Sequence, residues 1–107
     1  MTKVTIFKNA KNECVGFNVH GHAGYADAGE DIVCAAISVL VINTMNAIES
    51  FTNVTFSQDV DDASIRYRIN TPTKETTLLL NTMILGLQSL EDNEIYTKYI
   101  DLIFEEV

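Results

Sequence analysis

The stretch DIVCAAISVLVINTMNAIESF, residues 31–51, decides the fold class, because it forms either strands or one long helix. Its many β-branched residues locally favour strand. The stretch runs for about 20 residues without a turn signal, however, whereas strands usually run about 3–10 residues. We therefore predict a buried helix over 31–51 with Asp31 as its N-cap. Helical spacing relates a set of positions along it: Ile37, Val41, Thr44, Ile48 and Phe51.

Two predicted strands precede this helix. Residues 3–8 (KVTIFK) and 14–20 (CVGFNVH) alternate in the manner of half-buried strands, and the polar residues between them favour a turn. They therefore predict an antiparallel hairpin. Its second strand is expected to place Val15, Phe17 and Val19 on one face and Cys14, Asn18 and His20 on the other.

The second half of the chain repeats this order. Residues 53–58 and 63–70 predict two strands around the acidic turn DVDD. Thr71-Pro72 then opens a helix over 73–90, and residues 96–107 predict a last strand. The apolar stripe of that helix is expected at Leu79, Met83, Leu87 and Leu90. The order β-β-α-β-β-α-β predicts an α+β fold, a two-layer sandwich of a mostly antiparallel sheet and two helices.

Composition narrows the classes of function. A chain of 107 residues that is 47% hydrophobic and 21% charged fits one folded domain over 1–107. Its net charge of −8 disfavours direct nucleic-acid binding and favours basic protein partners. The apolar run 32–42 is shorter than the roughly 20 residues of a membrane span, so we expect no membrane contact. Two cysteines and no apparent secretory signal indicate free thiols in the cytoplasm.

The stretch GHAGYADAGEDIVCAAIS, residues 21–38, suggests chemistry. His22 follows the second strand, and Cys34 is expected in the first turn of the helix, where exposed N–H groups favour an anion. A thiolate with a nearby imidazole can carry out acyl transfer, and first-turn N–H groups could stabilise the oxyanion. The glycine-rich loop between them leaves room for a peptide. His22 and Cys34 are therefore a candidate catalytic pair.

Other interpretations of these residues stay open. Cys34 could be a small buried hydrophobe, and Ser38, one turn later, could bond only a backbone carbonyl. A metal site could use His20, His22, Cys34 and Asp31, although structural zinc sites usually have tighter paired ligands. Cys14, far from a helix start, is expected to be a packed thiol.

The same stretch resembles the signature of the bacterial ribosomal-processing cysteine proteases, the Prp family. Its first part is Gly21-His22-Ala23, and its second runs from Gly29 to Ser38 with the core Asp31-Ile32-Val33-Cys34-Ala35-Ala36. Length and element order are similar as well, so the resemblance covers essentially the whole chain.

The resemblance implies a cysteine endopeptidase that removes the N-terminal extension of a large-subunit ribosomal protein precursor. It implies Cys34 as nucleophile and His22 as general base and acid, without cofactor or metal. It also implies a homodimer whose substrate is a basic ribosomal protein. The alternative is a non-catalytic acidic module that binds such a protein or a ribosome-assembly partner. Further site residues would be Gly21, Asp31 and Ser38 in support, and Ala23, Gly24, Tyr25 and Gly29 in a substrate loop.

Overall fold

A computed structural model describes residues 1–21 and 28–107, with the backbone alone for 28–30. Within these residues the chain forms two long helices and a five-stranded sheet in the order β-β-α-β-β-α-β, so the predicted α+β fold is confirmed. The elements are β1 (Thr2–Lys8), β2 (Cys14–His20), α1 (Ala28–Phe51), β3 (Phe56–Val60), β4 (Ser64–Ile69), α2 (Lys74–Glu91), a short 3₁₀ helix η1 (Thr97–Tyr99) and β5 (Ile100–Glu106).

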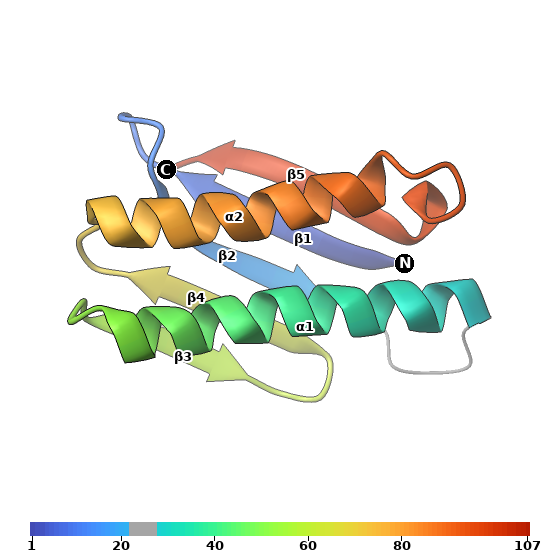
Figure 1. Cartoon of the computed structure of the whole chain (residues 1–107), viewed down its shortest axis with the longest axis horizontal. Helices are drawn as coiled ribbons and strands as arrows, with labels where there is room; N and C mark the ends of the chain where they lie inside the picture. Colours follow the sequence, from blue (N-terminus) through green and yellow to red (C-terminus); the bar gives the residue numbers. More distant parts are fainter. Residues whose placement is uncertain (22–27) are drawn as a thin grey trace.

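The strands lie in the order β3-β4-β2-β1-β5. The β1–β2, β2–β4 and β3–β4 pairs are antiparallel, whereas β5 pairs with β1 in parallel. Both helices lie side by side on one face of this sheet, which gives the predicted two layers (Figure 1). β2 is therefore the central strand, and β1 lies between it and the edge strand β5.

An irregularity in the β1–β2 pairing corrects the predicted faces of β2. Phe7 pairs with Gly16 and Lys8 pairs with Cys14, so Val15 is an extra residue opposite β1. Such a bulge reverses the alternation beyond it. Cys14 consequently lies on the same face as Phe17 and is fully buried in the core, whereas the sequence predicted the opposite face.

Helix α1 packs its apolar stripe against the sheet. Val33, Ile37 and Val41 are at most 1% exposed, and Ile48 continues the stripe. Phe51 was predicted to belong to it but is 77% exposed, because it is the last helical residue and lies beyond the sheet contact. The segment Asp31–Phe51 is long and apolar enough to cross a membrane by length and composition alone.

The start of α1 differs from the prediction in a way that affects the site. The helix begins at Ala28, so Asp31 lies within its first turn and the predicted N-cap role is wrong. Ala28 is a strong helix former, and the carboxylate of Asp31 is favourable in the first turn of a helix. The helix therefore extends upstream of Asp31 to Ala28. Cys34 is thereby carried to the second turn, about 9 Å from the helix start at 1.5 Å per residue.

Two strand boundaries also shift. β3 spans Phe56–Val60 rather than 53–58, and it pairs with β4 through Val60, which lies opposite Ile65. The turn therefore starts at Asp61, whose Oδ1 accepts the N–H groups of Ala63 and Ser64 at 2.8 and 2.7 Å. The last strand begins at Ile100, later than predicted, because Thr97–Tyr99 form η1.

Helix α2 is close to its prediction. It starts behind Thr73, which forms a capping box with Thr76, and ends at Glu91. The helix buries Met83 and Leu87 as expected, whereas Leu80 and Ile84 are more buried than the predicted Leu79 and Leu90. Gly86 lets α1 approach, since a Cβ there would lie 2.9 Å from Cδ2 of Leu40.

Candidate active site

An open groove of about 230 Å³ lies where the beginning of β1, the end of β2, the middle of α1 and the β3–β4 turn meet. We call it the Cys34 groove. Its floor is mainly aliphatic and its rim at the turn is acidic, so it combines an apolar trough with charge at one side. It is lined by Thr2, Val19, Gly21, Cys34, Ile37, Ser38, Ile42, Val60, Asp61, Asp62, Ala63, Ser64 and Ile65.

The thiol of Cys34 is half-buried in this groove and contacts the sheet. Its position follows from helical spacing, since Val33 and Ile37 anchor α1 in the core and turn the side chain of Cys34 toward β1. There Oγ1 of Thr2 and Sγ of Cys34 share a hydrogen bond of 3.1 Å, in which either atom could donate. The prediction of a merely buried cysteine does not fit this placement.

Two of the three predicted supporting residues join Cys34 in the groove. Gly21 lies at its edge against Thr2, and Ser38 lies one helical turn beyond Cys34. Asp31 is exposed and is not among the described residues that line the groove. Cys34 lies in the second turn of α1, whereas only the first-turn N–H groups lack intrahelical partners, so the oxyanion contact with those groups stays a prediction.

Several predicted site residues lie outside the described residues: His22, Ala23, Gly24 and Tyr25. The backbone of Gly29 is described and forms the second residue of α1 rather than part of a loop. Gly21 directly precedes these residues and lines the groove.

The acidic rim was missed by sequence reasoning, which treated residues 59–62 only as a turn. Hydrogen bonds from the backbone N–H groups of Ala63 and Ser64 lower the pKa of Asp61, so its carboxylate stays ionised. Asp62, the next residue, is exposed and lines the same groove. Thr2 was missed too, because its contact with Cys34 spans 32 positions and leaves no local pattern.

The second cysteine has a different environment. Burial raises the pKa of the Cys14 thiol, and its Sγ contacts the carbonyl oxygen of Gly16 at 3.4 Å. A buried neutral thiol is inert, as the sequence predicted. Among the described residues no three His, Cys, Asp or Glu side chains form a metal-binding group. The metal interpretation needed His22, which lies outside these residues, so it is not tested.

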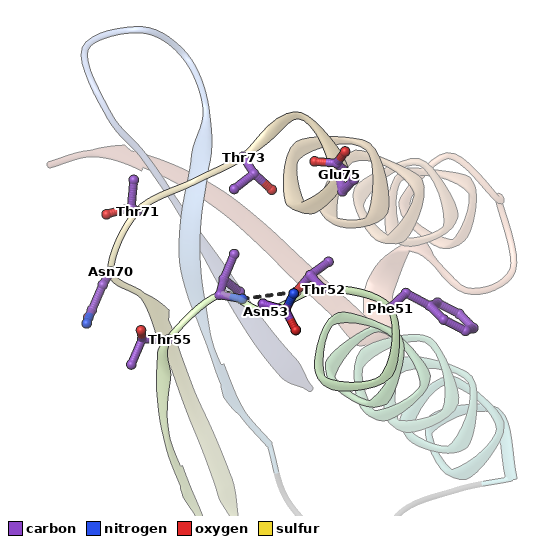
Figure 2. A pocket seen from close by; sticks show the side chains of 9 residues that line it. Phe51, Thr52, Asn53, Thr55, Asn70, Thr71, Thr73 and Glu75 are labelled. Atoms are coloured by element: carbon purple, nitrogen blue, oxygen red, sulfur yellow. Dashed lines mark hydrogen bonds between the residues drawn. The ribbon is translucent and has the colours of Figure 1, made fainter.

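A larger hollow of about 480 Å³ lies at the other end of α1 and is lined by threonine and asparagine side chains (Figure 2). Val54 donates its N–H to Thr52 Oγ1 there at 3.5 Å. Phe51, at its edge, follows Cys34 by 17 positions, which is about 25 Å along a helix. Its described lining contains no cysteine or histidine, so chemistry favours the smaller Cys34 groove.

The fold and this groove together define an α+β protein that presents a half-buried cysteine to an open trough, which is an arrangement suited to covalent thiol chemistry. Residues 1–101 match the family described as Cysteine protease Prp. The chain therefore belongs to this family and is a cysteine protease. The resemblance noted in the sequence is confirmed, and the enzyme is favoured over a non-catalytic binding module.

Relatives of known name agree with this assignment. The chain is 32% identical over 95 residues to the ribosomal processing cysteine protease Prp of Staphylococcus aureus, which covers 86% of this chain and 90% of that protein. The corresponding Bacillus subtilis protein is 24% identical over 98 residues, covering 85% and 88%.

Solved structures are similar over nearly the whole chain. The S. aureus protease Prp in complex with a substrate peptide has a TM-score of 0.90 at 29% identity, covering 98% of this chain and 100% of that one. The same S. aureus protease with a covalently linked product peptide has a TM-score of 0.85 at 30% identity, with the same coverage.

Proposed function

We propose that this cysteine protease removes the N-terminal extension of a large-subunit ribosomal protein precursor, with Cys34 as nucleophile and His22 as general base and acid. The observation that carries the proposal is the position of Cys34 in an open groove of a chain that belongs to the Prp family. The S. aureus relatives with a substrate peptide and a covalently linked product peptide support a peptide in this groove.

The chemistry follows from a thiol–imidazole pair. His22 takes the proton of Cys34, and the thiolate sulfur attacks the scissile carbonyl carbon to form a tetrahedral oxyanion. The C–N bond then breaks, and the imidazolium gives its proton to the leaving amine, which becomes the new N-terminus of the ribosomal protein. Water, activated by His22, hydrolyses the thioester and restores the thiol.

The supporting residues are assigned roles by their positions. Gly21 allows close approach of the backbone to Thr2, and Ser38 borders the groove one turn after Cys34. Asp31 is proposed to orient the imidazole from the first turn of α1. The segment that includes Ala23, Gly24 and Tyr25, together with Gly29 at the helix start, is proposed to contact the substrate.

The acidic rim supports a basic substrate. Asp61 and Asp62 place carboxylates at the groove of a chain whose net charge is −8. Such a rim attracts basic peptides, mainly by raising their rate of association. It also disfavours the binding of nucleic acid. Cys14 and Cys34 are separate thiols on β2 and α1, which is compatible with the reducing cytoplasm that we propose as the site of action.

The proposed homodimer has a physical basis in the outer face of the helix layer. Val39 and Leu85 are 68% and 65% exposed, and they flank the close contact between Leu40 and Gly86. Light scattering after size exclusion should give a dimer mass for the wild type and a monomer mass for the Val39→Arg, Leu85→Arg variant. A monomeric wild type at micromolar concentration would contradict the dimer.

The function is tested with a precursor peptide that carries the N-terminal extension. We expect Cys34→Ala and His22→Ala each to abolish its cleavage while the melting temperature stays near that of the wild type. Cys14→Ala is the matched cysteine control and should retain activity if it folds. Retained cleavage by Cys34→Ala would refute the proposed mechanism.

A further inference from the structure

The hydroxyl group of Thr2 is a buried polar group at the beginning of β1. Thr2 is the first residue of that strand, pairs with Ile100 of β5 and is only 3% exposed. A buried hydroxyl is costly unless it forms a hydrogen bond. The bond that the structure gives this hydroxyl is the 3.1 Å contact with Sγ of Cys34.

The surroundings of Thr2 hold this hydroxyl toward the thiol. Gly21 packs on it so tightly that a Cβ would lie 2.8 Å from Oγ1 and 2.9 Å from Cγ2 of Thr2. Threonine is also stiff about χ1 because its Cβ is branched. Thr2, Gly21 and Cys34 line the same groove, so the hydrogen bond lies at the site of the proposed reaction and not in the core.

We propose that Thr2 is a positioning residue that donates its hydroxyl hydrogen to the Cys34 thiolate and holds Sγ toward the groove. This inference rests on the proposed function of Cys34. A thiolate can only accept, so the hydroxyl is the donor once the thiol has lost its proton. Hydrogen bonds to a charged acceptor are the stronger ones.

The same contact should affect the reactivity of the thiol. Without the hydroxyl, Sγ loses this donor and the contact that holds it toward the groove, so Cys34 should react more slowly with a small electrophile. The same hydroxyl would donate to the sulfur again when the thioester is hydrolysed and the sulfur leaves as thiolate.

The test measures the rate of alkylation of Cys34 by iodoacetamide from pH 5 to pH 10, with peptide mapping to separate Cys34 from Cys14. In Thr2→Val, which has nearly the same shape, we expect the rate at pH 6 to fall about threefold, within the range that the loss of one hydrogen bond costs. Thr2→Ser should restore the wild-type rate.

Restoration by Thr2→Ser, which returns the hydroxyl but not the methyl group, is not expected if the loss came from packing alone. A Thr2→Val rate that equals the wild-type rate overturns the inference, as does failure of Thr2→Ser to restore it. If Thr2→Val does not fold, Thr2→Ala replaces it in the same comparison. Alkylation needs no peptidase activity, so cleavage retained by Cys34→Ala would refute the function without altering this result.

Discussion

Gly21 and Thr2 pack so closely that a Cβ atom on Gly21 would lie 2.8 Å from Oγ1 of Thr2, and that oxygen lies 3.1 Å from Sγ of Cys34. Gly21 and Cys34 therefore contact the same side chain from two sides. The sequence suggested close backbone approach as the role of Gly21. The structure adds what Gly21 approaches, namely Thr2, which contacts Cys34.

Gly21→Ala should displace Thr2 and lower the rate of alkylation of Cys34 at pH 6 about threefold, as loss of the Thr2 hydroxyl would. Gly86→Ala is the matched control, because its Cβ would meet Cδ2 of Leu40 at a similar 2.9 Å but away from the groove. The control should leave the alkylation rate of Cys34 unchanged. Equal alkylation rates in Gly21→Ala and the wild type would argue against this role of Gly21.

Gly16→Ala should destabilise the protein more than either of these changes. A Cβ at Gly16 would overlap the backbone carbonyl oxygen of Tyr67 on the neighbouring strand, and backbone in a sheet cannot move aside as a side chain can. We expect a loss of about 3 kcal/mol in the free energy of unfolding, near the upper end of overpacking costs. Urea denaturation measures it, and an unchanged midpoint would show that the strands can separate locally.

Asp62→Asn should weaken the binding of a basic substrate peptide. An exposed ion pair contributes about 0.2–1 kcal/mol, so KM should rise roughly 1.5- to 5-fold at low salt, with kcat unchanged. The difference should shrink as ionic strength rises, because salt screens exposed charges. Glu105→Gln removes the same charge from exposed β5 and serves as control. An equal effect from Glu105→Gln would assign the attraction to net charge rather than to the rim.

Cys14 should make stability fall at alkaline pH. Burial raises the pKa of its thiol above the ordinary value of 9.0, so the unfolded chain loses that proton first. Its stabilising contribution is complete below pH 9 and is lost as pH rises through the folded pKa. Urea titrations from pH 8 to pH 10.5 should show a steeper decline for wild type than for Cys14→Val. Equal declines in the stability of the two proteins would show that burial does not raise the pKa of the Cys14 thiol.

The element order and the helix nature of residues 31–51 could be predicted because both depend on periodicity over many residues. Thr2–Lys8, Cys14–His20 and Lys74–Glu91 differ from their predictions by at most one residue at either end. The family assignment was equally accessible, since the stretch from Gly21 to Ser38 carries both parts of its signature without a departure at the key positions.

Features that depend on one residue or on distant contacts were not accessible. The start of α1 was misplaced because Asp31 is favourable both as an N-cap and in a first turn, and the sequence does not distinguish the two. The burial of Cys14 depends on the extra residue Val15, which alternation alone does not reveal. Thr2 reaches Cys34 only after β1 has paired with β2 and α1 has packed on the sheet.

The central claim, that Cys34 attacks the scissile peptide bond, is tested most directly by trapping the intermediate. The enzyme is mixed with the precursor peptide, quenched in acid within milliseconds to seconds, and analysed by intact mass and peptide mapping. We predict a transient mass increase equal to the acylated N-terminal extension, located on Cys34 and absent from Cys34→Ala. Cleavage of the peptide by Cys34→Ala, or an adduct at another residue, would contradict the account.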